Sequence, residues 1–400
     1  MRKLKINSLK IGAFLELMKE RPSRFKNAII KPIPKEYPIN ALAKTLHPVF
    51  QAVKITAVEE HGLDCKTFTL SPDRDKKTSR LAYFASGQYI TVFLKINGLK
   101  ITRAYSLSSA PYESLGETGY YQITVKSAKD GLASNYILDN WNVGTEVQIS
   151  APEGNFDYVG LRDAPTVVGI AGGSGITPFL SFAKSIVHGD EDFNLILLYG
   201  SRDSNSILFK KEFDELQQQS SKIKVVHVLS NEEKDGFEHG FLTAELIKEY
   251  APETLFSVFL CGPQAMYNFM DNELKKLNLE KKYIRHEMFG EIHSAKTQEG
   301  YPGNAPAEVK ITVTICDETR TVTGSSDDTI LQILEKNGIA VPNRCRSGEC
   351  GWCHSLVKSG NYWMPAKLDF RRKADLKYNF IHPCCTFPLS DMELDVPPAK

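Results

Sequence analysis

The sequence lacks an uninterrupted apolar run of the roughly 20 residues that a membrane-spanning helix needs. The longest apolar stretches, at 167–182 and 195–199, are broken by Gly, Ser and Pro or are too short. The N-terminus is basic, but Glu16 interrupts its short apolar stretch and no small-residue cleavage site follows. We therefore expect no transmembrane segment and a cytoplasmic location.

The chain also lacks an excess of charge of one sign. It has 49 Lys and Arg against 48 Asp and Glu, so its net charge is +1. Attraction to nucleic acid or anionic lipid needs a strong field of one sign, and we expect no nucleic-acid partner. With 400 residues, of which 42% are hydrophobic, the chain is globular and too long for one core, which predicts two to three domains.

Cysteine is rare before residue 345, and the last part of the chain carries Cys345, Cys350, Cys353, Cys384 and Cys385. Such crowding in a cytosolic chain favours metal or cluster ligation over disulfides. The x4-then-x2 spacing of the first three, with another cysteine some thirty residues on, is that of plant-type 2Fe-2S ligands. A structural zinc site fits poorly, because it usually pairs two C-x2-C motifs or Cys with His.

Residues 1–46 form a basic N-terminal extension. Ile11, Phe14, Leu15 and Met18 have helical spacing and are followed by the Pro-rich stretch KPIPKEYP. This pattern predicts an amphipathic helix and an extended arm. The helix either packs on the next domain or docks to a partner or a membrane.

Periodicity divides the rest of the chain into four segments. Short β-rich runs separated by turn residues over 47–160 predict an antiparallel barrel, the barrel domain. Alternating strands and helices over 161–290 predict an α/β parallel sheet covered by helices, the parallel-sheet domain. Residues 291–307 are polar and rich in Gly and Pro, which indicates a linker, the connecting segment. Residues 308–400 begin with a hairpin pattern and a helix, and form the C-terminal domain.

The barrel domain contains Arg103-Ala104-Tyr105-Ser106 at a predicted strand start, followed by Lys126 and by GLASN from Gly131 to Asn135. A guanidinium fork suits a phosphate group. The four-residue motif is weak alone, and Tyr105 could be only an aromatic residue of the barrel core.

The parallel-sheet domain carries a Gly-rich strand-to-helix turn. Its residues Gly172, Gly173, Gly175 and Thr177 would let the backbone and a helix N-terminus approach a pyrophosphate, although such a turn can also be purely structural. A later strand ends at Cys261-Gly262-Pro263, and Glu287-Met288-Phe289-Gly290 closes the domain.

These motifs together resemble the ferredoxin-NADP reductase superfamily, in its branch with a C-terminal plant-type 2Fe-2S ferredoxin domain. Reductases of the phenylacetate-pathway, hybrid-cluster-protein and dioxygenase types belong there. The resemblance runs from residue 47 to 400. It implies a multidomain fold with an antiparallel β-barrel flavin domain, an α/β nucleotide domain and an α+β ferredoxin-like (β-grasp) domain.

The resemblance also implies roles for single residues. Arg103 would hold the flavin pyrophosphate, Tyr105 would stack on the isoalloxazine and Ser106 would bond near its N5. Cys261 would lie on the hydride path beside Glu287, with Phe289 covering the flavin. Further cofactor contacts would come from Lys126, Gly131, Ser134, Gly172, Gly173, Gly175, Thr177, Gly262 and Pro263. The cluster ligands would be Cys345, Cys350, Cys353 and a fourth cysteine that is either Cys384 or Cys385, of which Cys384 fits the spacing better. Trp352 replaces a residue that is usually small in this family. The form GLASNYI favours FAD over FMN.

The choice of nicotinamide cofactor depends on Ser201 and Arg202, which follow a predicted strand. A Ser-Arg pair suits the 2′-phosphate of NADPH, and we find no acidic residue where one would bind a ribose 2′-hydroxyl. Against this, Phe209 stands where NADPH users often have tyrosine, and Arg202 could be a solvated surface residue. The sequence favours NADPH slightly.

The predicted activity is an NAD(P)H-dependent reductase that passes electrons through FAD and a 2Fe-2S cluster to a protein acceptor, either an oxygenase or another redox enzyme. The flavin is needed because NAD(P)H gives two electrons and the cluster takes one. The alternative is a non-turnover electron-relay subunit of a larger complex. Candidate docking elements are the N-terminal arm and the basic cluster Arg371-Arg372-Lys373, which could otherwise be a solvated loop.

Overall fold

The computed structural model describes residues 37–398 except 63, 130, 289 and 293, together with residues 15, 18, 19, 22 and 26; the side chain of Thr45 is not described. The chain divides into two compact units, Met1–Thr45 and Leu46–Lys400. The amphipathic helix predicted around 11–18 lies mostly outside the described residues. A described helix, α2 (Pro38–Leu46), begins with Pro38 at its first position, where the missing N–H costs nothing. Within the described ranges, no helix combines the length and hydrophobicity of a membrane span.

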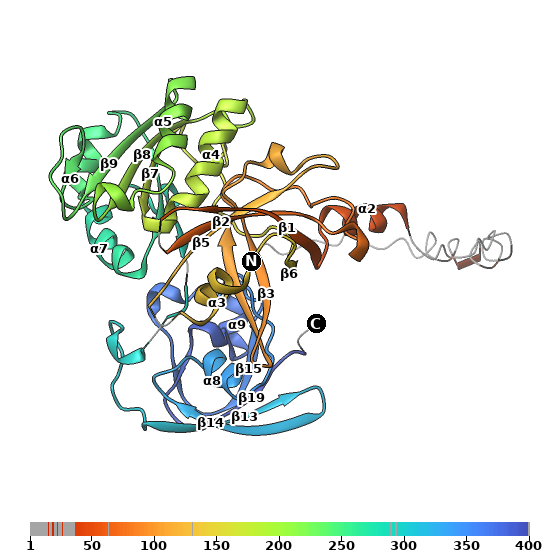
Figure 1. Ribbon diagram of the computed structural model, residues 1–400. Helices are drawn as coiled ribbons and strands as arrows, with labels where there is room; N and C mark the ends of the chain where they lie inside the picture. The colour runs from red at the N-terminus through yellow and green to blue at the C-terminus, as the bar shows by residue number, and fades with distance from the viewer. Residues whose placement is uncertain are drawn as a thin grey trace. The chain divides into compact units, whose positions relative to one another are not determined.

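The barrel domain contains a six-stranded antiparallel sheet in the order β4-β3-β6-β1-β2-β5. Figure 1 labels β1, β2, β3, β5 and β6 of this sheet. An isolated bridge between Leu107 and Ile123 joins the end of β4 to β5. Side chains alternate across the strands, so that Val53 and Ile55 of β1 are buried in its core. The elements are β1 (Gln51–Glu60), β2 (Cys65–Pro72), β3 (Tyr89–Ile96), β4 (Leu99–Ser106), β5 (Tyr121–Lys126), α3 (Leu132–Asn140) and β6 (Glu146–Ile149).

Strand β4 follows β3 through a tight turn at Asn97-Gly98. Both residues have positive φ, +51° and +84°, as the mirror-image turns of hairpins require. Hence Arg103-Ala104-Tyr105-Ser106 lies at the C-terminal end of β4, and its prediction at a strand start was wrong. The Asn-Gly pair is the sequence signal that locates this strand.

The parallel-sheet domain has the strand order β10-β9-β8-β7-β11-β12, and every described pair in it is parallel. Its two faces pack into two separate apolar clusters, as the near-continuous apolar strands predict. The strands are β7 (Thr166–Gly172), β8 (Asn194–Ser201), β9 (Ile223–Leu229), β10 (Glu238–His239), β11 (Ser257–Gly262) and β12 (Ile284–Met288), and the helices are α4 (Thr177–His188), α5 (Lys210–Gln219), α6 (Ala244–Tyr250) and α7 (Gln264–Lys275).

The C-terminal domain is a mixed five-stranded sheet in the order β14-β13-β19-β15-β17, in which β13 and β19 are parallel. Helix α8 packs its apolar residues Ile330, Leu331 and Ile333 into the core, and Thr329 caps it by accepting a hydrogen bond from the Gln332 N–H. The elements are β13 (Glu308–Ile315), β14 (Glu318–Ser325), α8 (Ile330–Lys336), β15 (Ser355–Ser359), β16 (Tyr362–Trp363), α9 (Lys373–Lys377), β17 (Phe380–Ile381), β18 (Phe387–Pro388) and β19 (Met392–Asp395). The predicted three-part fold class is confirmed.

The connecting segment 291–307 is less independent than its polar composition indicates. Ile292 and Ala295 are buried in the core of the C-terminal domain, and the Asp327 carboxylate accepts hydrogen bonds from Ser294 and from the backbone N–H of Lys296. The first half of this segment therefore packs as part of the C-terminal domain.

Candidate functional site

A cavity of about 690 Å³ lies where the barrel domain, the parallel-sheet domain and the C-terminal domain meet. This volume is in the range of sites that bind small organic ligands. The barrel domain contributes the end of β4 and the start of α3, and the parallel-sheet domain contributes Ser174 and Thr177. From the C-terminal domain come one face of α8 and the residues Cys345 and Arg346.

Seven of the predicted cofactor-binding residues line this cavity. They are Arg103, Tyr105, Ser106, Lys126, Gly131, Ser134 and Thr177. The residues of the two glycine motifs, Gly172, Gly173, Gly175, Gly262 and Pro263, are not part of its lining, nor are Ser201 and Arg202. Phe289 lies outside the described residues.

The cavity wall fits a flavin in two respects. Ser106 is buried, and its Oγ finds no hydrogen-bond partner within the part of the chain that the structure describes, so a ligand atom can satisfy it. At Gly131, which precedes α3, an added Cβ would clash with the Ser134 Oγ and the Ala128 Cβ. The backbone at Gly131 and the Ser134 hydroxyl therefore lie close together in this wall, an arrangement that suits the binding of a phosphate.

Arg103 already has an acidic neighbour that the sequence did not indicate. Its guanidinium donates to the Thr102 carbonyl at 2.7 Å and to the Glu291 Oε2 at 3.3 Å. Burial lowers the pKa of Arg103, although a guanidinium stays charged. Glu291 belongs to the connecting segment and is mostly buried.

The two glycine motifs of the parallel-sheet domain touch one another. A Cβ at Gly175 would overlap the Cys261 carbonyl, and Cβ atoms at Gly172 or Gly262 would clash with the Met266 Sδ. Only glycine permits this approach of the turn after β7 to the end of β11. The turn is a short 3-10 helix, Gly173–Ile176, that leads directly into α4.

Cys261 and Glu287 are paired neighbours at the ends of β11 and β12. Tyr267, which no sequence pattern marks, joins the two ends. Its hydroxyl accepts a hydrogen bond from the Gly262 N–H at 3.1 Å and donates one to the Glu287 carbonyl. The structure thus fixes the two predicted catalytic side chains side by side.

Burial favours the neutral form of both side chains. Burial raises the pKa of the Glu287 carboxyl well above its usual range, and the Glu349 and Asp157 carboxylates add to the rise. Burial also raises the pKa of the Cys261 thiol, helped by Glu287. Glu287 can therefore donate a proton or a hydrogen bond, whereas Cys261 is a poor nucleophile.

Arg202 is exposed just after β8. The acidic side chains near it are already engaged. Asp203 accepts a hydrogen bond from the Ser206 N–H at 2.9 Å, and Glu232 accepts one from the Ser204 N–H at 2.7 Å. This leaves Arg202 available for an anionic ligand.

Four cysteine sulfurs come together in the C-terminal domain. The Cys345 thiol interacts with those of Cys350 and Cys384, and the Cys353 and Cys384 sulfurs are 3.4 Å apart. The backbone N–H groups of Ser347 and Cys350 donate to the Cys345 Sγ, both at 3.4 Å. A set of four sulfurs with amide donors fits a 2Fe-2S cluster.

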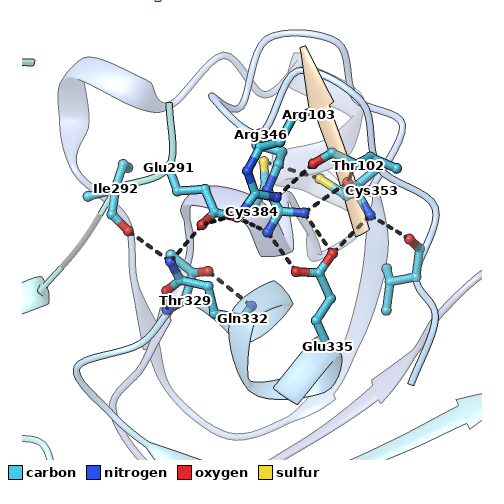
Figure 2. Close-up of polar contacts among 12 residues, drawn as sticks. Thr102, Arg103, Glu291, Ile292, Thr329, Gln332, Glu335, Arg346, Cys353 and Cys384 are labelled. Carbon is cyan, nitrogen blue, oxygen red and sulfur yellow. Dashed lines mark hydrogen bonds and ion pairs between the residues drawn. The ribbon is translucent and has the colours of Figure 1, made fainter. Parts of the chain in front are cut away.

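A charged network joins the cluster loop to the cavity (Figure 2). The buried Arg346 donates to both carboxylate oxygens of Glu335, each at 2.6 Å, and contacts Glu291, which in turn pairs with Arg103. Burial raises the pKa of Glu335 to about 7, against the opposing effect of Arg103. Two cations and two carboxylates thus connect the end of β4 with the residue beside Cys345.

Three family models match consecutive parts of this chain. They are an oxidoreductase FAD-binding domain at residues 52–158, an oxidoreductase NAD-binding domain at 170–272 and a 2Fe-2S iron-sulfur cluster binding domain at 313–389. Among curated proteins, the ferredoxin reductase component of 3-ketosteroid-9-alpha-monooxygenase from Mycobacterium tuberculosis is 31% identical, over 80% of this chain and 87% of that protein. The chain belongs to the ferredoxin reductase component family.

Two further similarities agree with this assignment. The glycine betaine monooxygenase reductase subunit of Pseudomonas aeruginosa is 24% identical, over 86% of this chain and 94% of that protein. The solved structure of phthalate dioxygenase reductase has the same fold, with a TM-score of 0.61 and 24% identity over 87% of this chain and 98% of that one. The reductase described here is therefore an iron-sulfur flavoprotein that passes electrons from NAD(P)H through FAD and a 2Fe-2S cluster to a protein acceptor.

Proposed function

We propose that this protein is the reductase component of an oxygenase and works in the cytoplasm. The observation that carries the proposal is that the end of β4, Thr177 and Cys345 line one cavity, so that hydride donor, flavin and cluster would meet there. When bound, the flavin takes two electrons from NAD(P)H and releases them singly to the cluster. The related reductase components of monooxygenases support an oxygenase as acceptor.

The barrel domain holds the FAD in this proposal. Arg103, Lys126, Gly131 and Ser134 bind its phosphates, Tyr105 lies against the ring system, and Ser106 donates its unpaired hydroxyl to the ring. Charge-assisted hydrogen bonds from a buried guanidinium suit this task because few waters compete there.

The parallel-sheet domain presents the nicotinamide to that ring. The turn of Gly172, Gly173 and Gly175 and the Gly262-Pro263 pair accept the dinucleotide backbone, and Thr177 lines the shared cavity. Cys261, which is buried at the end of β11, would lie near the reacting carbon. Glu287, whose pKa is raised by burial, would donate a hydrogen bond at the reaction site. The family resemblance assigns Phe289 the role of covering the flavin, and this residue lies outside the described part of the chain.

Ser201 and Arg202 favour NADPH by offering a hydroxyl and a guanidinium to a 2′-phosphate. The support is that the carboxylates of Asp203 and Glu232, which would otherwise repel that phosphate, accept hydrogen bonds from backbone N–H groups. Phe209 is buried in the core and is not placed to stack on an adenine.

The cluster ligands in this proposal are Cys345, Cys350, Cys353 and Cys384. Electrons leave toward an acidic acceptor through α9 and its preceding residues. Arg371 belongs to the predicted basic cluster but pairs with Asp369 at 2.8 Å, so Arg372 and Lys373 are the exposed cations. The His354 Nε2 lies 2.9 Å from the Asp375 Oδ1, which ties α9 to the residue after Cys353.

Turnover of the isolated holoprotein tests this proposal against the relay-subunit alternative. An independent reductase oxidises NADPH and reduces ferricyanide and cytochrome c rapidly without other proteins. A relay subunit copurifies with partners, turns over slowly alone and needs residues 1–46 for assembly. Two observations together would favour the relay. Turnover of the isolated protein would be slow with or without residues 1–46, and deletion of these residues would abolish the copurifying complex.

A further inference from the structure

Three polar side chains around Cys345 reach out of the C-terminal domain. Asn343 accepts a hydrogen bond from Thr102 of β4, Arg344 pairs with Glu153, and Arg346 reaches Arg103 through Glu291. Each contact joins the loop around the first cluster cysteine to the barrel domain or to the connecting segment. The loop therefore presents its cysteine to the barrel domain from a fixed position.

Of the three contacts, the one made by Arg344 lies outside the cavity. The Arg344 side chain is 4% exposed, and its Nη1 lies 2.7 Å from the Glu153 Oε1, whose side chain is 22% exposed. Its Nη2 also donates to the Val49 carbonyl at 3.5 Å. A charge pair shielded this well from water is stronger than a surface pair, and removing one partner leaves the other charge buried.

Trp352 forms the other wall around this guanidinium. The Arg344 guanidinium lies 4.1 Å from the centre of the Trp352 ring and 5.9 Å from that of Phe93 in β3. Guanidinium groups stack favourably on indole faces. Trp352 stands between Cys350 and Cys353, and Arg344 directly precedes Cys345. The stack therefore joins the two ends of the cysteine loop, and the pair of Arg344 with Glu153 joins this loop to the barrel domain.

Glu153 is held rigidly on its side of the contact. Its backbone N–H and C=O exchange hydrogen bonds with Tyr89, at 2.8 and 2.9 Å, where β3 begins. The neighbouring Tyr89 ring lies so near Gly154 that a Cβ there would be 3.0 Å from it. Glu153 is thus hydrogen-bonded to the barrel sheet through its backbone.

We propose that Glu153, Arg344 and Trp352 form a clamp that positions the cluster for electron transfer from the flavin. The proposal rests on the cofactor sites proposed above. Electron transfer slows steeply with distance, so its rate follows the fraction of molecules in which the C-terminal domain is docked. Arg344 and Glu153 are 191 positions apart. Among the described residues, the side chain of Arg344 contacts Glu153, Val49, Trp352 and Phe93, none of which is assigned to the flavin or nicotinamide. Arg344 is a positioning residue.

The test separates the two electron-transfer steps in single-turnover stopped-flow experiments on the full-length holoprotein. Flavin reduction by NADPH is followed at the flavin band and cluster reduction at the cluster band, for Glu153→Gln, Trp352→Phe and Trp352→Gly. Cluster reduction in Glu153→Gln should be roughly tenfold slower, which corresponds to a docked population reduced to about one tenth. Flavin reduction, iron content and the EPR spectrum should match the wild type.

A charge exchange makes the test specific. The double variant Glu153→Arg with Arg344→Glu restores a pair of opposite charges but not the stack on Trp352, and it should recover part of the lost rate, whereas each single reversal should be slow. Trp352→Phe should lie between wild type and Trp352→Gly. As a matched control, Arg320→Gln removes an exposed pair with Glu318 within the C-terminal domain and should change neither step.

The outcomes distinguish this proposal from the one it rests on. Unchanged cluster reduction in Glu153→Gln and Trp352→Gly, or equal slowing of both steps, would overturn the clamp. Loss of iron in these variants and in Trp352→Phe would show that the residues only stabilise the loop, and would also overturn it. A wild-type protein that binds no iron or does not reduce its cluster with NADPH would overturn the proposed function itself.

Discussion

The Cys384 sulfur lies 3.4 Å from the Cys353 sulfur, whereas the adjacent Cys385 thiol donates to the His382 carbonyl at 3.5 Å. Cys384 also interacts with Cys345, so it faces two of the other candidate ligands. Cys385 is fully buried and contacts Cys384 through its side chain, whereas its influence on Cys353 is only electrostatic. The two cysteines lie in a short 3-10 helix, Pro383–Cys385, and not in the extended segment that the sequence suggested. Successive side chains of a helix with three residues per turn point in directions about 120° apart, which explains why one cysteine faces the site and the next does not.

We therefore predict that Cys384→Ser loses or strongly perturbs the cluster, because a hydroxyl is a harder and weaker ligand for iron than a thiolate. Cys385→Ser should keep the native visible and EPR spectra and the iron content. The paired variants control for each other, since both replace a buried thiol at neighbouring positions. Loss of the cluster in Cys385→Ser but not in Cys384→Ser would reverse the assignment.

The second prediction concerns the nicotinamide cofactor. Arg202→Ala should weaken binding of NADPH by roughly ten- to a hundredfold, the effect of losing one charge-assisted contact of about 1.5–3 kcal/mol. Binding of NADH should change little, because NADH has no 2′-phosphate. Titrations with both cofactors check this. Lys310→Ala, on an exposed strand position of the C-terminal domain, is the control. Equal losses for NADPH and NADH would refute the preference for NADPH.

The third prediction uses the buried part of the connecting segment. A chain ending at residue 290 should fold, bind FAD and reduce ferricyanide, but should not reduce a one-electron protein acceptor. A chain ending at residue 303 should be less soluble, because Ile292 and Ala295 lose the core into which they pack. Flavin content, ferricyanide reduction and light scattering distinguish the two. If the chain ending at residue 290 failed to bind flavin, the domain boundary would lie further toward the C-terminus.

The sequence predicted most of the secondary structure and named seven of the residues that line the cavity, because strand and helix periods, glycine turns and cysteine spacing are local patterns. It missed contacts that form only when distant segments meet. Glu291 pairs with Arg103 across 188 positions, and no local pattern marks it. The same holds for the Arg344–Glu153 pair. Helix α9 was also missed, since a five-residue helix depends on its Asp375 cap and on His354 more than on its own pattern.

The fourth prediction follows from the raised pKa of Glu287. The native state keeps a proton that the unfolded chain releases above its ordinary pKa of about 4.3. Above that pH the native state binds more protons than the unfolded state. The free energy of unfolding therefore falls as pH rises, by at most about 1.4 kcal/mol per pH unit for one proton, until the raised pKa is passed.

Glu287→Gln removes this titration while keeping the size of the side chain. The variant should show a flatter decline of stability between about pH 5 and pH 7, measured as urea midpoints of the holoprotein at each pH. Glu318→Gln, at an exposed carboxylate, should run parallel to the wild type. A Glu287→Gln profile parallel to the wild type would mean that Glu287 is ionised in the native protein.

The last prediction concerns the exit of electrons. Arg372 and Lys373 are exposed, while the two carboxylates nearest them are turned inward: Asp369 binds Arg371, and Asp375 binds His354 and the Arg372 N–H. The surface at the start of α9 is thus positive, on a segment joined to the residue after Cys353. An acidic acceptor would be attracted to it, and this attraction weakens with salt.

Reversing both charges, Arg372→Glu with Lys373→Glu, should slow reduction of the acidic protein acceptor at low ionic strength by roughly tenfold or more, through a lower association rate. Ferricyanide reduction should not fall in the same way, since a small anion has other routes to the flavin and the cluster. Lys310→Glu, which changes the sign of one exposed charge elsewhere on the same domain, controls for the overall charge. The salt dependence of the acceptor reaction should nearly vanish in the double variant. A rate and a salt dependence that both equal those of the wild type would place the docking surface elsewhere, with the N-terminal arm as the next segment to delete.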